Sequence, residues 1–344
     1  MKHVISVIAL SIFVSCAHLQ GRASKQEWQV IAHRGASAYL PEHTLEAVAM
    51  AAGWGVDFVE PDVVLTRDNV PVVLHDIHLE NSTDVAQKFP FRKRKDGRYY
   101  VRDFRLREIQ TLNVLERSKE HDPTKAVFPN RFPRTLNRNS FRVPSLEEYL
   151  EFVEGLRQTT GHKLGVCPEI KSSAFHLKEG QDIVKIVYET VMRFGYEKTP
   201  ELIYLQSFDP ADLKRLKSEM KTKIPLVQLV GKNSWGESAA DYEKMLSPEG
   251  LKEVANYAQV FSPSLDQLFT SIPGSKQQRA DLVSGWAHAA GLKVIPYTHR
   301  REQLPEGFDS IETFFKVLKN DSKIDGIFSD SADDVLIWQG RLKQ

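Results

Sequence analysis

The stretch of sequence that decides the fold is Glu60-Pro-Asp-Val-Val-Leu-Thr-Arg-Asp-Asn-Val-Pro-Val-Val-Leu-His75-Asp76. Two apolar runs within it flank a polar segment, which is the pattern of a β-hairpin with a short loop. Centring the turn between Asp68 and Asn69 places Asp62 opposite His75. The stretch therefore predicts that a carboxylate and a histidine meet at the open end of one hairpin.

Polar side chains also end the neighbouring apolar runs. Within the hairpin, Glu60 and Asp62 share a face because strand side chains repeat with period two. Upstream, Ile31-Ala-His33-Arg34-Gly35 ends an apolar run, and Val166-Cys-Pro-Glu169-Ile-Lys171 does the same downstream. Three strand ends that carry His, Arg, Glu, Asp and Lys predict one polar site on a β scaffold.

Length and charge set the broad class. The chain has 344 residues, and its 46 basic residues nearly balance its 45 acidic residues. This balance argues against a nucleic-acid partner and against a role that depends on charge attraction to a membrane surface. The composition is that of a globular protein large enough for one sizeable domain.

The first 16 residues form a predicted signal peptide. A basic start precedes the apolar run Val4–Val14, which is shorter than the roughly 20 residues that span a bilayer. Phe13-Val-Ser-Cys16 resembles a bacterial lipoprotein cleavage box, with Cys16 as the lipidated residue. Cleavage after Ala17 by an ordinary signal peptidase fits about as well, and we favour the lipoprotein slightly. We expect an exported protein of the bacterial periplasm or cell envelope, in contact with a membrane only through a lipid on Cys16.

From Trp28 onward, short apolar runs alternate with amphipathic segments of helical period. The predicted strands are 29–32, 56–65, 164–170, 202–206, 225–230, 259–262, 293–297 and 325–329. Strands with intervening helices favour a (β/α)8 TIM barrel over residues 28–340, after a linker at 17–27. A doubly wound open sheet is the alternative. The barrel is preferred because polar residues gather at the C-terminal ends of several different strands.

The segment 78–141 breaks this alternation. It is long, polar and basic, and it contains the run Phe91-Arg-Lys-Arg-Lys-Asp-Gly-Arg98. We interpret it as an insertion after the second strand, on the face of the barrel that holds the polar site. Its charges form a solvated surface or steer a phosphate toward the site.

The carboxylates predict a metal site. Glu60, Asp62 and Glu169 offer oxygen ligands from two strand ends, which is the donor set that calcium or magnesium requires. The alternative is a salt-bridge network of these carboxylates with Arg34 and Lys171. Convergence of the carboxylates with two histidines favours the metal.

The histidines and cations predict acid–base chemistry on an anion. His33 and His75, at adjacent strand ends, suit a general acid and a general base. Arg34 and Lys171 can hold an anion, and the planar fork of Arg34 suits phosphate. Together with a metal, these groups fit the cleavage of a phosphodiester.

Several motifs resemble those of the glycerophosphodiester phosphodiesterases, in the order in which that family has them. The resemblance is closest to the long, calcium-dependent periplasmic or lipoprotein form. The motifs are His33-Arg34-Gly35, Leu40-Pro-Glu-His-Thr-Leu45, Glu60-Pro-Asp62, Leu74-His75-Asp76, Arg94-Lys-Asp-Gly-Arg-Tyr-Tyr100, Pro168-Glu169-Ile170-Lys171, Leu205-Gln206-Ser207-Phe208 and Phe328-Ser329-Asp330.

This resemblance implies a barrel of the kind found in phosphatidylinositol-specific phospholipase C. It implies a glycerophosphodiester substrate, cleaved to glycerol 3-phosphate and an alcohol such as choline or ethanolamine, with Ca²⁺ or else Mg²⁺ as cofactor. The family is thought to use the 2-hydroxyl of the substrate as nucleophile, and the acid and base roles of the two histidines stay unassigned. Gln206, Phe208 and Tyr297 would line the glycerol pocket. Asp330 would orient a partner or cap the next helix.

Two other functions remain open at this stage. Lipoprotein export and the basic insertion are compatible with a surface protein that binds a host or envelope partner. A phospholipase that acts on lysophospholipids at the membrane is the other alternative.

Overall fold

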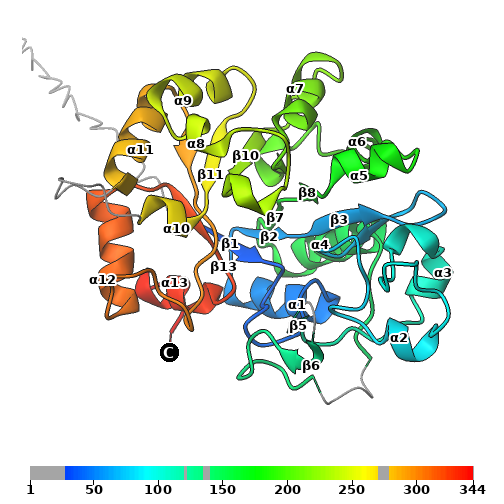
Figure 1. The fold of residues 1–344 in the computed structure, drawn as a ribbon. Helices are drawn as coiled ribbons and strands as arrows, with labels where there is room; N and C mark the ends of the chain where they lie inside the picture. Colours follow the sequence, from blue (N-terminus) through cyan, green and yellow to red (C-terminus); the bar gives the residue numbers. More distant parts are fainter. Residues whose placement is uncertain (1–27, 120–121, 135–139, 270–278, 344) are drawn as a thin grey trace, which may run out of the picture.

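The computed structural model describes residues 28–119, 122–134, 140–269 and 279–343 (Figure 1). The predicted signal peptide and linker lie outside the described residues. Within the described ranges, no helix is long and apolar enough to cross a membrane.

All the predicted strands form, and two of them are interrupted at a proline. The strand predicted at 56–65 becomes β2 (Phe58–Glu60) and β3 (Asp62–Leu65), and the one at 164–170 becomes β7 (Gly165–Val166) and β8 (Glu169–Ile170). The other barrel strands are β1 (Gln29–His33), β9 (Leu205–Ser207), β10 (Leu226–Val230), β11 (Val260–Pro263), β12 (Lys293–Val294) and β13 (Gly326–Ser329).

These strands close into a ring. All the pairings between barrel strands are parallel, in the order β13, β1, β2/β3, β7/β8, β9, β10, β11, β12. The ring is completed where Phe328 of β13 donates its main-chain N–H to the carbonyl of Pro296, just after β12, at 3.0 Å. The (β/α)8 barrel is therefore confirmed, and the open sheet is excluded.

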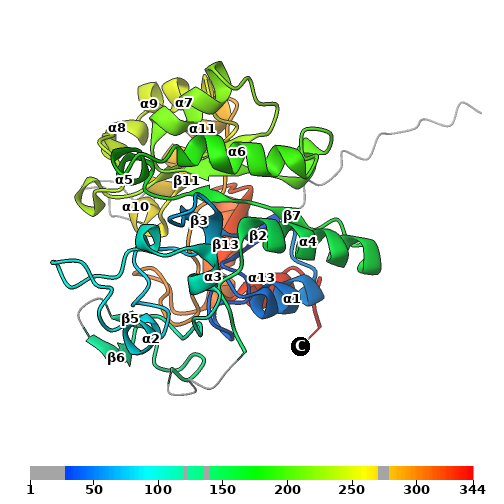
Figure 2. The same cartoon turned by 90° about the vertical axis from the view of Figure 1, so that its right-hand side faces the viewer.

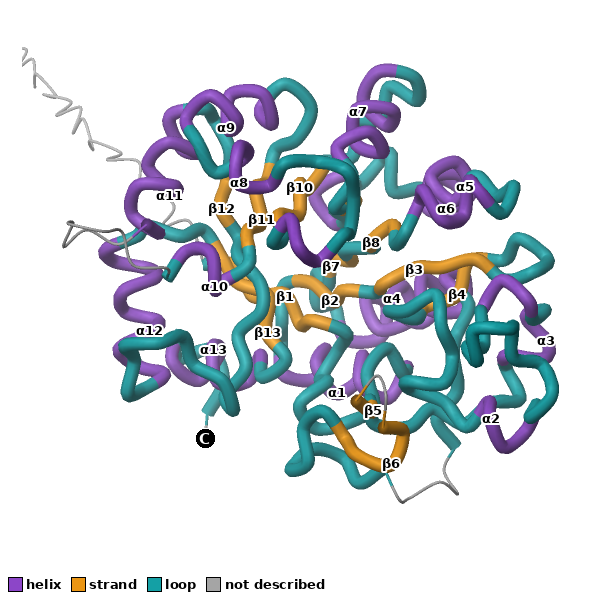
Figure 3. Tube along the Cα trace, in the orientation of Figure 1, coloured by secondary structure: helices purple, strands orange, loops and turns teal. Residues whose placement is uncertain are grey.

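Helices surround the ring, as the purple tubes around the orange strands show (Figure 3). The sequence sets their ends: Ser145 and Glu148 form a capping box at the start of one helix, and Asp209 caps another. The helices that follow the barrel strands in turn are α1 (Leu45–Trp54), α4 (Leu146–Thr160), α6 (Ile183–Arg193), α7 (Pro210–Ser218), α9 (Pro248–Ala255), α11 (Arg279–Ala289), α12 (Ile311–Lys316) and α13 (Ala332–Trp338). Short helices are α5 (Ser173–Lys178), α8 (Tyr242–Met245) and α10 (Leu265–Leu268), with single turns at Pro200–Leu202, Asn233–Trp235 and Val317–Asp321.

The hairpin forms, but its predicted register is wrong by one residue. Strand β3 pairs in antiparallel fashion with β4 (Pro71–Val73), and Leu74 donates its N–H to the carbonyl of Asp62 at 2.9 Å. Asp62 therefore opposes Leu74 and not His75. The hairpin is centred on Asp68, and not between Asp68 and Asn69, and the turn is made with Asn69 in a left-handed conformation, with φ 59°.

The insertion packs on the hairpin and builds a second hydrophobic core. The hairpin contributes Val64, Val72 and Leu74 to this core, while Val63 and Val73 belong to the core of the barrel. The insertion elements are α2 (Val85–Lys88), a 3₁₀ turn at Val101–Asp103, α3 (Leu106–Ile109), β5 (Ser118–Lys119) and β6 (Asp122–Ala126). Both views show these elements gathered beside the barrel (Figures 1 and 2).

Candidate active site

The register of the barrel strands brings the predicted site residues together. His33 lies beside Glu60, Asp62 lies beside Glu169, and Glu169 lies beside Gln206. Neighbouring residues of parallel strands face the same side of the sheet, so these side chains share the interior face at the C-terminal end of the barrel. This is the end at which barrel enzymes build their sites.

The three predicted metal ligands converge. One oxygen from each of Glu60, Asp62 and Glu169 lies within 4.8 Å of the others, and all three side chains are buried. Glu60 accepts hydrogen bonds from the main-chain N–H of Arg34 at 3.0 Å and from Nε2 of Gln206 at 2.9 Å. These contacts fix the direction of the Glu60 carboxylate. Gln206 therefore positions Glu60 in addition to lining the cavity.

The salt-bridge network considered as the alternative is also present. Lys171 Nζ lies 2.7 Å from Oε1 of Glu169, and Arg34 Nε lies 3.4 Å from Oδ2 of Asp62. It does not neutralise the cluster, because burial and the repulsion of Asp62 and Glu169 still raise the pKa of Glu60 well above its ordinary value. Oδ1 of Asp62 is buried and meets no hydrogen-bond donor among the described residues. An all-oxygen cluster with an unsatisfied buried oxygen fits a hard divalent cation.

Both histidines are oriented by a carboxylate. Nδ1 of His33 lies 2.6 Å from Oδ1 of Asp330, and Nδ1 of His75 lies 2.5 Å from Oδ1 of Asp76. A hydrogen bond from Nδ1–H to a carboxylate leaves Nε2 as the basic nitrogen. Of the two roles considered for Asp330, orientation of a partner is the one the structure shows. The N-cap position of helix α13 is Ser331, one residue after Asp330.

The surroundings keep both histidines neutral. Burial, with the charge of Arg34, lowers the pKa of His33 to about 4. Burial lowers the pKa of His75 to about 3, and the charges of Arg34 and Lys171 act in the same direction. Lys171 Nζ lies 3.4 Å from Nε2 of His75. Each Nε2 can therefore accept a proton at neutral pH.

Arg34 is placed by an unusual turn at the end of β1. Its φ is 59° and that of Gly35 is 80°. A Cβ on Gly35 would lie 2.9 Å from the carbonyl carbon of Ala47 in α1, so only glycine fits both the conformation and the space. The turn directs the N–H of Arg34 to Glu60, and Nη1 of Arg34 binds Glu42 at 3.0 Å.

A cavity of about 430 Å³ lies over these groups. Phe208 and Tyr297 line it and pack edge to face, with ring centroids 5.9 Å apart. The hydroxyl of Tyr297 donates to the carbonyl of Val230 at 2.9 Å, so the ring faces the cavity while the hydroxyl serves the fold. The predicted residues that line the cavity are His33, Arg34, Glu60, His75, Glu169, Lys171, Gln206, Phe208 and Tyr297; Asp62 does not.

Several functional side chains were not predicted. Glu42 and His43 follow β1 and bind Arg34 and Asp62, respectively. Arg117 and Arg131 come from the insertion and bind Asp76 and Asp330. The pair of ionisable residues in Leu40-Pro-Glu-His-Thr-Leu45 is a signal for the first two. The two arginines lie outside the basic run 91–98.

An acidic cluster that could hold a divalent cation, beside two neutral histidines that are each bound by a carboxylate, suits the hydrolysis of a phosphoester. Residues 33–334 match the family model of the glycerophosphoryl diester phosphodiesterase family. The chain belongs to this family, as the resemblance of its motifs implied.

Curated relatives agree over nearly the whole chain. A glycerophosphodiester phosphodiesterase of Haemophilus influenzae is 38% identical over 350 residues, covering 96% of this chain and 95% of the relative. One of Treponema pallidum is 34% identical and covers 93% of each chain.

Solved structures share the fold at lower identity. The chain is similar to a putative glycerophosphoryl diester phosphodiesterase of Silicibacter pomeroyi, at 23% identity and a TM-score of 0.67, covering 92% of this chain and 94% of that one. It is also similar to an Oleispira antarctica phosphodiesterase solved with the product sn-glycerol-3-phosphate, at 20% identity and a TM-score of 0.60, covering 91% and 96%.

Proposed function

We propose that the protein hydrolyses glycerophosphodiesters, such as glycerophosphocholine or glycerophosphoethanolamine, to glycerol 3-phosphate and the free alcohol. The observation that carries this proposal is the meeting of the acidic cluster, Arg34 and two neutral histidines in one cavity of about 430 Å³. Family membership and the curated relatives of the same name support it.

Glu60, Asp62 and Glu169 would hold one divalent cation, and Ca²⁺ is the first choice, with Mg²⁺ as the alternative. Three carboxylates without a nitrogen or sulfur donor favour a hard ion, and the flexible coordination of Ca²⁺ tolerates a cluster shaped by two strand ends. When bound, the ion supplies positive charge to the phosphoryl oxygens, which lowers the cost of the charge that develops there.

The side chains of the protein supply binding and proton transfer. Arg34 and Lys171 would hold the phosphate, and the rings of Phe208 and Tyr297 would pack on the glycerol carbons. Nε2 of one histidine takes the proton of the attacking hydroxyl. The other histidine, which is neutral in the free protein, takes a proton from solvent at its Nε2 when the anionic phosphodiester is bound and passes that proton to the oxygen of the departing alcohol. If the 2-hydroxyl attacks, one P–O bond forms to its oxygen as the P–O bond to the alcohol breaks, and water then opens the resulting cyclic phosphate by displacing the 2-oxygen, which leaves glycerol 3-phosphate.

The direct test is the release of glycerol 3-phosphate from glycerophosphocholine by the purified protein. We expect activity that a chelator abolishes and that added Ca²⁺ restores, with Mg²⁺ compared at the same concentration. A diester that lacks a hydroxyl next to the ester carbon tests the nucleophile: if the 2-hydroxyl attacks, such a diester is not cleaved. Release of no glycerol 3-phosphate under any metal would overturn the proposed function.

Export with a lipid on Cys16 is a separate proposal, supported by the sequence pattern of residues 1–17. Labelling with radioactive palmitate in a bacterial host tests it. We expect labelled protein in the envelope fraction and loss of the label in Cys16→Ser. Soluble, unlabelled protein in the periplasm would instead indicate cleavage by an ordinary signal peptidase.

A further inference from the structure

Each site histidine is the end of a three-residue chain that reaches into the insertion. In the first chain, His75 binds Asp76, and Oδ2 of Asp76 accepts from Nη1 of Arg117 at 2.7 Å. In the second, His33 binds Asp330, and Oδ2 of Asp330 accepts from Nη2 of Arg131 at 2.8 Å. In each chain one carboxylate oxygen holds the histidine and the other holds the arginine.

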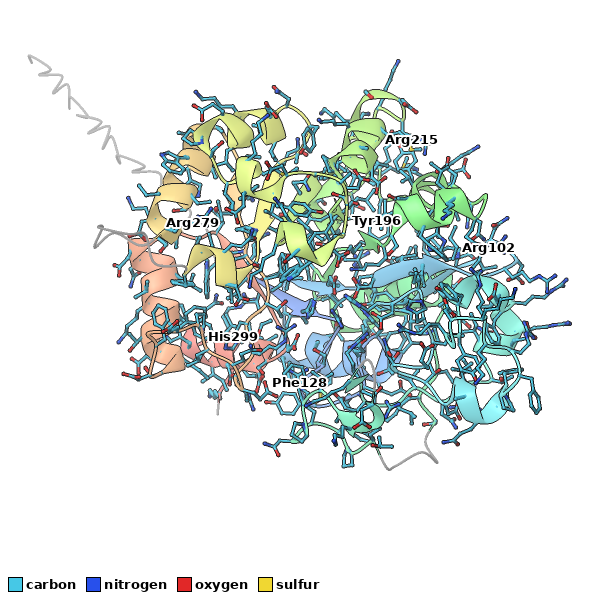
Figure 4. The ribbon with its side chains drawn as sticks, in the orientation of Figure 1. Arg102, Phe128, Tyr196, Arg215, Arg279 and His299 are labelled. Carbon is cyan, nitrogen blue, oxygen red and sulfur yellow. The ribbon has the colours of Figure 1, made fainter. Side chains whose placement is uncertain are left out.

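The two arginines come from one part of the insertion, on either side of the β5–β6 hairpin. They line a second cavity, of about 310 Å³, that lies between the insertion and the barrel and that His33 and His75 also line. Phe128 lines the same cavity and is labelled in Figure 4; the guanidinium carbon of Arg131 lies 3.8 Å from the centre of its ring. Residues of the insertion and both histidines therefore line the same cavity.

A buried carboxylate that lost its cation would not keep its place. Asp76 and Asp330 are largely buried, and burial alone would favour their neutral forms. Their neighbours hold the pKa of each well below its ordinary value; Arg117 and His75 act on Asp76, and Arg300 and His33 act on Asp330. A neutral or displaced carboxyl would release Nδ1 of the histidine, and the ring would then be free to turn Nε2 away from the cavity.

We propose that Arg117 and Arg131 are positioning residues that hold Asp76 and Asp330, and through them aim the Nε2 atoms of His75 and His33 at the bound phosphodiester. The insertion is then part of the active site. In a barrel without the insertion, the Nε2 atoms of the two histidines would not be directed at the phosphodiester. The proposal rests on the proposed function, since it assigns residues to the same reaction.

The geometry makes the two chains unequal. Asp330 has a second cation, because Nε of Arg300 in the loop after β12 donates to its Oδ2 at 2.9 Å. The additional partner of Asp76 is the neutral amide of Asn81, at 2.6 Å. Loss of Arg131 is therefore compensated in part, while loss of Arg117 is not.

Arg117 also has a second task. Its Nε donates to both oxygens of Glu42, at 3.2 and 3.0 Å, and Glu42 in turn binds Nη1 of Arg34. One guanidinium thus connects the phosphate-binding arginine to the histidine of the hairpin. This gives a second reason to expect a larger effect from Arg117 than from Arg131.

The experiment compares kcat for glycerophosphocholine with the Kd of glycerol 3-phosphate, measured by calorimetry in the presence of Ca²⁺. For Arg117→Ala we expect kcat to fall about 10–100-fold, and the Kd of glycerol 3-phosphate to rise by a smaller factor, because Glu42 still binds Arg34 in this variant. For Arg131→Ala we expect a smaller fall, and for Arg131→Ala with Arg300→Ala a fall larger than the product of the two single effects. Arg94→Ala is the matched control, because Arg94 is an insertion arginine that pairs with Asp103 and Glu179.

Two further measurements separate positioning from a loss of fold. Guanidinium ion added to Arg117→Ala should restore part of kcat in a saturable way, which an unfolded protein would not show. The downfield proton resonance of His75 Nδ1–H, bonded to Asp76, should be present in the native protein and Arg94→Ala and lost in Arg117→Ala. The double variant Asp76→Asn with Arg117→Ala should have a kcat only slightly lower than that of Asp76→Asn alone, since both substitutions act through one carboxylate.

The outcomes are distinct. An inactive native protein overturns the proposed function. An active native protein whose Arg117→Ala variant keeps kcat and the His75 proton resonance overturns the positioning role. Equal losses in Arg117→Ala and Arg94→Ala would also overturn it, because they would reduce both residues to supports of the insertion fold.

Discussion

Nε2 of His43 lies 2.8 Å from Oδ2 of Asp62, so one oxygen of this carboxylate is held, while Oδ1 meets no donor among the described residues and stays available to the acidic cluster. The same chain segment places Glu42 against Arg34, and the segment therefore braces both the acidic cluster and the phosphate-binding arginine. His43 itself adopts a left-handed conformation, with φ 65°, which shows that the fold fixes this residue firmly.

The first prediction follows from this contact. His43→Ala should lower the Ca²⁺ affinity about 10–100-fold, because an outer hydrogen bond that orients a ligand typically has that effect. Calorimetric titration with Ca²⁺ measures it. His162→Ala is the control, since the imidazole of His162 binds the carbonyl of Val56, at 2.7 Å, and His162 does not line the cavity. An unchanged affinity in His43→Ala would count against a metal role for Asp62.

The second prediction separates the ligands from the histidine of the hairpin. Glu60→Gln, Asp62→Asn and Glu169→Gln keep their shape but lose a charge, so each should weaken Ca²⁺ binding and turnover together, with partial recovery in excess Ca²⁺. His75→Ala should lose about 10²–10⁴-fold in rate and keep its affinity for Ca²⁺. Loss of the metal in His75→Ala, with retention in Asp62→Asn, would reverse the assigned roles.

The third prediction concerns pH. The pKa values of His33 and His75 are lowered to about 4 and about 3, so both rings are neutral in the free protein above those values. The acid limb of the kcat/KM profile should therefore fall as the pH drops through about 4, and not near the 6.5 of an ordinary histidine. Activity measured from pH 3 to 8 with saturating Ca²⁺ tests it. An acid limb near pH 6.5 would contradict the lowered pKa of the ring that acts as the base.

The fourth prediction concerns the turn at the end of β1. Gly35→Ala should lower the free energy of unfolding by about 1–3 kcal/mol, because alanine must adopt φ 80° with its Cβ 2.9 Å from the carbonyl carbon of Ala47. Urea unfolding measures the change. The matched control is Gly155→Ala in α4, where a Cβ meets no atom within 4 Å and alanine should be neutral or stabilising.

The fifth prediction concerns Glu116, which is buried beside Glu42. Burial, together with the charge of Glu42, raises the pKa of Glu116 to about 8 in the folded state, whereas the unfolded chain has the ordinary value of 4.5. Between these values the unfolded state binds fewer protons, so Glu116 makes stability fall as the pH rises from about 4.5 to 8.

Glu116→Gln should remove this dependence. The variant should match the native protein near pH 4.5 and be more stable above pH 8, as judged by urea unfolding at both pH values. Glu151→Gln, at an exposed position of α4, is the control that should change neither. A native protein whose stability rises across this window would contradict the assignment.

The barrel could be predicted because each strand is a short apolar run that ends in polar residues. The order of strands and helices stays the same even where the predicted end of a strand is wrong by a residue. The convergence of Glu60, Asp62 and Glu169 followed from the same rule, since all three lie toward the ends of the strands predicted at 56–65 and 164–170. In the structure Glu60 ends β2, while Asp62 and Glu169 begin β3 and β8 just after the interruptions. The register of the hairpin did not follow. It depends on whether Asn69 takes a left-handed conformation, and one backbone angle there moves every residue of β4 by one position.

The supporting residues could not be predicted for a different reason. Arg117 and Arg131 belong to a segment with little regular structure, so no periodicity indicates which of its many cations point inward. Their partners, Asp76 and Asp330, are distant in sequence: 41 and 199 residues away. Only the folded chain shows that two arginines of the insertion lie nearer to the chemistry than the conspicuous basic run.

The hairpin of β3 and β4 belongs to two hydrophobic cores at once, with Val63 in the barrel and Val64 in the insertion. Strand β3 begins at Asp62, one of the three proposed metal ligands. Because one face of β3 packs on the insertion, a local opening of the insertion would expose that face to solvent. Heat or a protease cut in the insertion should therefore abolish metal binding while the rest of the barrel remains closed. We expect thermal inactivation, measured by loss of turnover, to occur at a lower temperature than the unfolding of the barrel.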